Sequence, residues 1–223
     1  MDIKNFISEF EQVFPEHERY TEDCNGYIDP IPEIEGAASP KGMWLLNLAY
    51  SFLNHNEAYL EIGAYHGKNL VAALRYNDPR PIYVCDNFSQ YTINNPLESF
   101  SYNIHRCRLT NRIILFNSAF QDILTAKSIQ HKIGAYYYNG PHDMGNQYDS
   151  VVLAEPILAD DAIVIISNWN DPPVRKGTYE AIEGSDNSWG LLYDLPARNR
   201  NDVEMWWNGM AVFSFNRRNG EKE

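Results

Sequence analysis

The chain alternates between short apolar runs of strand length and segments whose apolar residues recur at helical spacing. A helix is expected over about 3–14, followed by a loop rich in Pro, Glu and Gly that runs to about Gly36. Ser39 and Pro40 then mark a helix start. Apolar runs predict strands at 58–63, 81–86, 112–117, 133–139 and 162–167. Helices are expected between them at about 67–75, 97–109, 120–126 and 147–155, with Pro156 ending the last. This alternation predicts parallel βαβ units with helices on both faces of one sheet.

The end of the chain breaks this alternation. Residues 191–195 and 209–215 form two strand patterns, and the segment between them is too short and polar for a crossover helix. We therefore expect these strands to pair antiparallel. The prediction is an α/β, doubly wound, Rossmann-like sheet of five parallel units closed by a hairpin. It forms a single domain over 1–223, with residues 1–38 as an N-terminal helix and lid-like extension.

Composition and charge narrow the function classes. The 223 residues are 44% hydrophobic and carry 18 Lys and Arg against 30 Asp and Glu, a net charge of −12. A surface this negative repels a phosphate backbone, so we expect a small-molecule partner and no nucleic acid. The longest apolar runs are too short to cross a membrane, and the first residues do not resemble a secretory signal. Cys24, Cys85 and Cys107 match no disulfide framework or zinc spacing, which predicts reduced thiols and a cytoplasmic protein.

The turn after the first predicted strand, in EIGAYHG, has the pattern of a ligand-binding loop. Doubly wound sheets bind ligands beyond the carboxyl ends of their strands. Gly63 and Gly67 frame this turn, where a missing Cβ lets the backbone approach a ligand. Asp86 ends the second strand, where its carboxylate could accept both hydroxyls of a ribose. A dinucleotide fingerprint would need a further glycine at Tyr65, so NAD, FAD and a nicotinamide-dependent oxidoreductase are disfavoured.

The chain resembles the class I methyltransferases in EIGAYHG, in VCD and in YNGPHDMGNQYDSVVLAEPILADDAIVIISNWND. Within them it is similar to the branch of macrocin O-methyltransferase-like and cephalosporin hydroxylase-like enzymes, which is methyltransferase family 24-like. IEGAASPKGMWLL and WWNGMAVF extend this resemblance, which covers about Glu35 to Phe215. It implies a seven-stranded sheet with an antiparallel last strand, S-adenosylmethionine as cofactor, and methyl transfer as the activity.

The resemblance also implies cofactor-binding residues at the ends of the first four strands. They are Glu61, Gly63, Ala64, Tyr65, Gly67, Asp86, Asn87, Ser118, Ala119 and Asn139. Glu61, Gly63 and Gly67 would hold the methionine end of the cofactor, and Asp86 would hold its ribose. Ser118 and Ala119 would border the adenine.

A metal site known from this branch is expected to be lost. Many relatives carry acidic ligands at the ends of strands four and five, where this chain has Asn139, Ser167 and Asn168. Magnesium prefers anionic oxygen ligands, so three neutral side chains predict no functional metal. Asp143 or Asp171 could restore a site only if the loops shift by a few residues.

His142, in NGPH, is the candidate catalytic residue. Its unperturbed pKa lies near neutrality, so it could deprotonate a hydroxyl beside the sulfonium; the alternative is a surface or helix-capping histidine. For His66, in the glycine loop, we expect the backbone to matter more than the ring. The leading hypothesis is O-methylation of a small molecule with His142 as base and no metal. The alternative is a catalytically silent cofactor-binding or scaffold protein.

Aromatic residues leave two interpretations open. Trp169, Trp189, Trp206 and Trp207 could wall an acceptor pocket or could pack the terminal hairpin onto the sheet. Residues 136–138 are three tyrosines that alternate across the fourth strand, so at least one of them faces the core in either register. We expect these tyrosines to be core residues.

Overall fold

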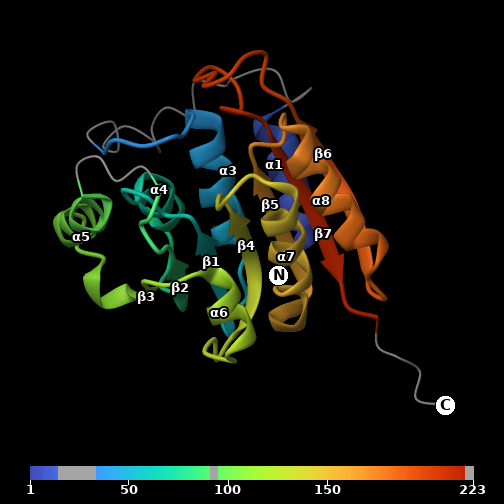
Figure 1. The fold of residues 1–223 in the computed structure, drawn as a ribbon, viewed down its shortest axis with the longest axis horizontal. Helices are drawn as coiled ribbons and strands as arrows, with labels where there is room; N and C mark the ends of the chain where they lie inside the picture. The colour runs from blue at the N-terminus through green and yellow to red at the C-terminus, as the bar shows by residue number, and fades with distance from the viewer. Residues whose placement is uncertain (15–33, 91–94, 219–223) are drawn as a thin grey trace.

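A computed structural model describes residues 1–14, 34–90 and 95–218. Its strands form one sheet in the order β3-β2-β1-β4-β5-β7-β6 (Figure 1). They are β1 (Glu57–Ile62), β2 (Ile82–Cys85), β3 (Ile113–Phe116), β4 (Lys132–Tyr138), β5 (Leu158–Ser167), β6 (Ser188–Leu195) and β7 (Met210–Asn216). The first five pair in parallel, whereas β7 pairs antiparallel with both β5 and β6. The predicted doubly wound sheet and its closing hairpin are confirmed.

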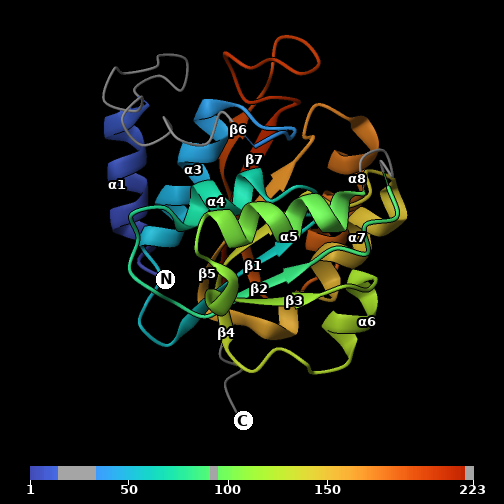
Figure 2. The same cartoon turned by 90° about the vertical axis from the view of Figure 1, so that its left-hand side faces the viewer.

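Helices cover both faces of this sheet. They are α1 (Ile3–Val13), α3 (Pro40–Ser51), α4 (Lys68–Leu74), α5 (Pro96–Arg106), α6 (Phe120–Thr125), α7 (Met144–Val152) and α8 (Pro172–Glu183). Side chains of α1, α3, α4 and α5 share one hydrophobic cluster, and those of α6 and α8 share the other, together with Leu153 and Ala154 directly after α7. Figure 2 shows α1 and α3 on one side of the sheet and α6, α7 and α8 on the other. Because both faces are covered, the central strands read as continuous apolar runs.

Three predicted boundaries, the two ends of the helix after the fourth strand and the start of the fifth strand, were wrong. The helix expected at 147–155 begins at Met144, because the Asp143 side chain accepts a hydrogen bond from the Asn146 backbone N–H at 3.0 Å and caps the helix. It ends at Val152, and Pro156 lies in a separate 3₁₀ turn, Glu155–Ile157. That turn leads directly into β5, which therefore begins at Leu158 rather than at 162.

Helix α8 was missed. Its buried positions are Val174, Gly177, Thr178 and Ala181, a set too small and polar to produce a clear apolar stripe. The packing against α7 explains this pattern, since a Cβ on Gly177 would lie 2.4 Å from the backbone oxygen of Met144. Small residues let the two helices approach closely, so α8 is buried without large apolar side chains.

The predicted N-terminal helix is confirmed as α1, and aromatic contacts attach it to the rest of the fold. The ring of Phe10 stacks on Tyr193 of β6 with centroids 4.0 Å apart, and Phe14 meets Trp44 of α3 edge-on at 5.1 Å. Residues 15–33, which include most of the predicted loop and Cys24, lie outside the described residues. Cys85 and Cys107 are free thiols. In the part of the chain that the structure covers, no helix has the length and apolar character needed to span a membrane.

Candidate active site

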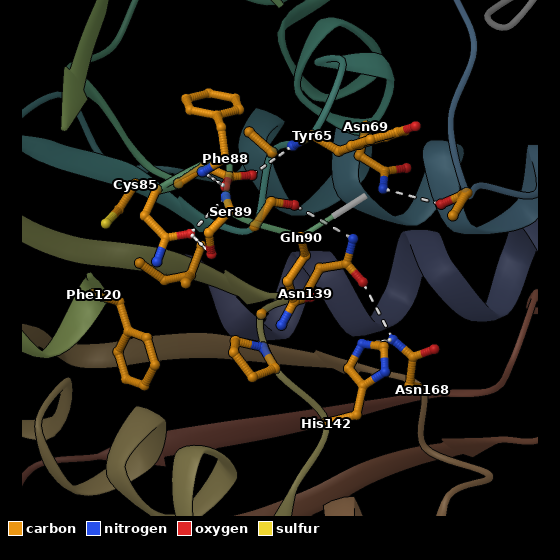
Figure 3. Close-up of a pocket in the computed structure, with 18 of the residues that line it drawn as sticks. Tyr65, Asn69, Cys85, Phe88, Ser89, Gln90, Phe120, Asn139, His142 and Asn168 are labelled. Atoms are coloured by element: carbon orange, nitrogen blue, oxygen red, sulfur yellow. Dashed lines mark hydrogen bonds between the residues drawn. The ribbon is translucent and has the colours of Figure 1, made fainter. Parts of the chain in front are cut away.

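A cavity of about 640 Å³ opens at the carboxyl ends of the parallel strands (Figure 3). The loops after β1 to β5 line it, together with Gly36 and Ala37 before α3 and with residues of the loop between β6 and β7. This is the edge at which doubly wound sheets bind ligands, and the volume is that of a small-molecule site. Among the described lining residues, Lys68 and Asp86 carry a formal charge.

The β1 turn forms one wall of the cavity as the glycine pattern predicted. Gly63 has φ +83°, and a Cβ there would lie 2.1 Å from the backbone oxygen of Asn139. The following Ala64 and Tyr65 line the cavity, and Tyr65 also has a positive φ of 50°. The turn therefore depends on a backbone conformation that most side chains disfavour.

We expect Gly63→Ala to lower the free energy of unfolding by about 1–3 kcal/mol, because the new Cβ would force the β1 and β4 loops apart at a strained φ. Chemical denaturation would measure this loss. Gly184→Ala is the matched control: its φ is −84° and its Cβ would meet no atom closer than 3.6 Å. Equal stability of the two variants would contradict the expected clash at Gly63.

Asp86 holds two loops of the cavity together. Its Oδ2 accepts a hydrogen bond from the Tyr65 backbone N–H at 2.8 Å, and its Oδ1 accepts one from the Phe88 N–H at 2.7 Å. Each carboxylate oxygen keeps a further lone pair for a ligand hydroxyl. Asn87 also lines the cavity and accepts hydrogen bonds from Ser89. The residue predicted to hold a ribose therefore also shapes the pocket around it.

Ser118 and Ala119 lie at the same end of the cavity, beside Phe120. The Ser118 hydroxyl is buried and has no hydrogen-bond partner among the described residues, so it is available to a ligand. Its backbone oxygen accepts a hydrogen bond from the Cys85 thiol at 3.3 Å. Burial raises the pKa of Cys85 to about 12, which makes this thiol a neutral packing group.

Glu61 and Gly67 do not line the cavity, although both were expected to contact the cofactor. Glu61 is fully buried and accepts a hydrogen bond from the Tyr59 hydroxyl at 2.9 Å. Burial raises the pKa of Glu61 to about 8, so it is largely protonated at neutral pH. Gly67 caps α4, and a Cβ there would lie 3.2 Å from the Phe100 ring. These two residues shape the β1 turn from behind the cavity wall.

Neutral side chains at the ends of β4 and β5 bond to one another. The Ser167 hydroxyl donates a hydrogen bond to Asn139 Oδ1 at 2.6 Å. The Asn168 amide nitrogen lies 2.7 Å from His142 Nε2, 3.0 Å from Ser167 Oγ and 3.3 Å from Asn139 Oδ1 (Figure 3). These are the positions at which relatives were expected to carry metal ligands. The side chains instead form a hydrogen-bonded network that ends on His142.

The acids considered as replacement ligands are engaged elsewhere. Asp143 caps α7, and Asp171 lies 3.6 Å from the Arg200 guanidinium. In the described ranges, no group of three or more His, Cys, Asp or Glu side chains is placed to hold a metal ion.

His142 lines the cavity in its neutral form. Burial lowers the pKa of His142 below its usual value, and the negative charge of Asp171 opposes part of this shift. An amide nitrogen can only donate, so the Asn168 nitrogen at 2.7 Å places Nε2 as an acceptor. His66 differs, since its ring stacks on Tyr65 at 3.7 Å while its backbone oxygen accepts a hydrogen bond from Asn103.

The loop between β6 and β7 supplies two lining residues that the sequence did not predict, Asn201 and Asn208. Of the four tryptophans considered as pocket walls, Trp207 lines the cavity. Trp169 and Trp206 are buried in the two cores, and Trp189 packs on Phe215 with ring centroids 5.0 Å apart. All three tyrosines of 136–138 are buried, as expected. The WWN sequence before Gly209 was the only signal that this loop could reach the site.

Comparisons with known proteins agree with this geometry. Residues 60–169 match a family model described as a methyltransferase domain. Cofactor-bound Rv0187 from MTB has 14% identity and a TM-score of 0.62, with 88% of this chain and 89% of that one covered. The O-methyltransferase TomG from Streptomyces achromogenes, solved with SAM, has 14% identity and a TM-score of 0.60 over 97% and 99% of the two chains. A Bacillus cereus O-methyltransferase solved with SAH has 14% identity and a TM-score of 0.57 over 95% and 91%.

No curated protein matches the chain. At these identities the solved structures establish the fold, with its seven strands and antiparallel last strand. The family model adds the domain type, over the segment that contains the β1 turn, Asp86 and the Asn139 network. Fold, site and family model together place the chain among the class I S-adenosylmethionine-dependent methyltransferases, in their family 24-like branch.

Proposed function

We propose that this enzyme methylates a hydroxyl group of a small, uncharged acceptor, with His142 as the base and without a metal ion. The observation that carries this proposal is the hydrogen bond of 2.7 Å between His142 Nε2 and Asn168, at the place where relatives would hold an acidic metal ligand. A neutral imidazole replaces a metal as the group that promotes loss of the hydroxyl proton.

The cavity fits S-adenosylmethionine. Gly63 leaves the space that a Cβ would fill, and the buried Ser118 hydroxyl offers an unused hydrogen-bonding group. We propose that the contacts come from the predicted residues that line the cavity: Gly63, Ala64, Tyr65, Asp86, Asn87, Ser118, Ala119 and Asn139. When bound, the cofactor supplies an activated methyl group, so the protein must mainly orient the acceptor and remove one proton.

His142 can accept the hydroxyl proton because Asn168 can give up its hydrogen bond to the imidazole ring. The Asn168 amide has two hydrogens and three acceptors within reach, on His142, Ser167 and Asn139. When an acceptor hydroxyl replaces Asn168 at Nε2, both amide hydrogens still have partners. The hydroxyl proton then moves to Nε2 as the hydroxyl oxygen gains the methyl group.

The acceptor class follows from the lining near His142. Asn168, Asn201, Trp207 and Asn208 are neutral, which favours an uncharged acceptor with hydrogen-bonding groups. The net charge of −12 opposes nucleic-acid binding. The fold alone does not decide between these classes, because some structures that match it are described as rRNA methylases. RNA therefore belongs in the acceptor screen.

Two broader proposals rest on fewer observations. Gly36 and Ala37 line the cavity, which supports one domain over 1–223 with residues 1–38 as a lid-like extension of the site. The free thiols of Cys85 and Cys107 are typical of a reducing compartment, which supports the cytoplasm.

Isothermal titration with S-adenosylmethionine and S-adenosylhomocysteine, with and without magnesium, tests the proposed function. We expect both compounds to bind equally well with magnesium or EDTA, and we expect turnover of a hydroxylated acceptor in EDTA. Micromolar magnesium binding, or turnover that requires magnesium, would contradict the metal-free proposal. Tight cofactor binding with no product from small molecules or RNA would favour the silent scaffold.

A further inference from the structure

We infer that Asn208, in the loop between β6 and β7, is a positioning residue that sets the tautomer of His142 through Asn168. The inference deepens the proposed function and rests on it for its catalytic consequence. The geometry itself is a chain of amide hydrogen bonds. It runs from the backbone of Asn201 through Asn208 and Asn168 to the His142 ring.

One end of this series of hydrogen bonds is fixed by a group that can only donate. The Asn201 backbone N–H donates a hydrogen bond of 2.8 Å to Asn208 Oδ1, so the Asn208 amide nitrogen must point the other way. That nitrogen donates to Asn168 Oδ1 at 3.0 Å. The Asn168 nitrogen is thereby directed at His142 Nε2, 2.7 Å away. Each amide accepts a hydrogen bond on its oxygen and donates one from its nitrogen, so the orientation of one amide fixes the orientation of the next.

The orientation of Asn168 is also fixed from its other side, through Asn139, by a group that can only accept. The Asn139 amide nitrogen lies 3.4 Å from the backbone oxygen of Gly63, which directs Asn139 Oδ1 toward Ser167 and Asn168. This requires the same orientation of Asn168, with its nitrogen toward Oδ1 and toward His142. Two independent backbone groups, the Asn201 N–H and the Gly63 oxygen, therefore select the same orientation of the Asn168 amide. This fixes which amide atom is nitrogen and which is oxygen from the hydrogen-bond network.

Asn208 is held rigidly enough to transmit this direction. The Asn170 side chain donates to the Ala197 oxygen at 2.7 Å and accepts from the Ala197 N–H at 3.2 Å. The Asn170 backbone N–H donates to the backbone oxygen of Asn208 at 2.9 Å. Asn170 thus joins both ends of the β6–β7 loop to the loop after β5. Side chains that position a reacting group act best when neighbouring hydrogen bonds fix them in this way.

The consequence for His142 is specific. With Asn168 donating, Nε2 carries a lone pair and Nδ1 carries the proton. If Asn168 turned its oxygen to the ring, Nε2 would carry the proton and could not accept one from a hydroxyl. Asn208, together with Asn139 on the other side of Asn168, therefore determines which ring nitrogen can act as the base, without contacting the ring itself.

The test is Asn208→Asp, studied with ¹⁵N-labelled histidine. Aspartate can still accept from the Asn201 N–H, but it cannot donate to Asn168, so we expect Asn168 to turn. The chain has six histidines, and the His142→Gln spectrum identifies the signals of His142. We expect the wild-type protein to carry the proton on Nδ1 and Asn208→Asp to carry it on Nε2. We also expect kcat to fall at least tenfold, with the cofactor KM within twofold of wild type.

Asn201→Asp is the matched control, because it adds the same charge in the same loop and its backbone N–H remains. We expect it to leave the proton on Nδ1. A wild-type ring protonated on Nε2, or the same tautomer in all three proteins, would overturn the inference. A tautomer that switches in Asn208→Asp while kcat is unchanged would support the positioning role and remove His142 as the base. The two failures are therefore distinguishable.

Discussion

Replacing His142 by Ala should lower kcat by about 10²–10⁴-fold, the usual contribution of a general base, while leaving cofactor binding unchanged. The expected loss is large because the proposed mechanism assigns removal of the hydroxyl proton to this imidazole alone. His142→Gln should be equally slow, since its side-chain oxygen can accept from Asn168 but cannot take up a proton at neutral pH. Initial rates with a responsive acceptor, together with calorimetry for the cofactor, would measure both effects.

The pH profile offers an independent check on this role. A base acts in its deprotonated form, and burial lowers the pKa of His142. We therefore expect kcat to be level at and above neutral pH and to fall only as the pH drops below the ordinary range of histidine. His105→Ala, on the exposed side of α5, should leave both kcat and this profile unchanged. Full activity of His142→Ala would show that alignment alone suffices for methyl transfer.

Replacing Asp86 by Ala should weaken the binding of S-adenosylhomocysteine at least 100-fold. The variant loses the acceptor of two backbone N–H groups, at 2.8 and 2.7 Å, in addition to the proposed contacts with the ribose. Hydrogen bonds to a charged group contribute about 1.5–3 kcal/mol each, so a loss on this scale follows from little more than one of them. Calorimetry or a thermal shift with the ligand would measure the change.

Two further variants separate the causes. Asp86→Asn keeps the shape but offers one acceptor oxygen instead of two, so its affinity should lie between those of Asp86→Ala and the wild type. Asp78→Ala removes the same charge from an exposed position outside the cavity and should bind normally. If Asp86→Ala binds within threefold of wild type, then Asp86 does not organise the cofactor site.

Local features made much of the fold predictable. The parallel units follow from the alternation of apolar strands and helices, and the hairpin follows from the short polar connection before β7. Helix α8 was missed because Gly177 buries backbone against α7 rather than a large side chain against the sheet. Hydrophobic periodicity detects helices that bury large apolar side chains, and a helix that packs closely through small residues does not produce this pattern.

The predicted site residues also divide into those whose position follows from a strand end and those whose position depends on the tertiary structure. Gly63 and Asp86 are tied to strand ends, so their position in the sequence places them at the cavity. Glu61 has a direction set by the pleat of β1, which turns it toward Tyr59 and away from the cavity. Trp207 reaches the cavity because of the path of a long loop, which no periodicity describes.

By itself, the sequence determined the succession of strands and helices along the chain, the glycine turn and the absence of acids at Asn139, Ser167 and Asn168. These depend on neighbouring residues and on residue identity. Only the tertiary structure decided that the three neutral side chains bond to one another, and that Asn208 directs Asn168 toward His142. Asn168 and Asn208 are 40 positions apart in the chain. The orientation of an amide depends on the partners around it in space, and the fold brings those partners together.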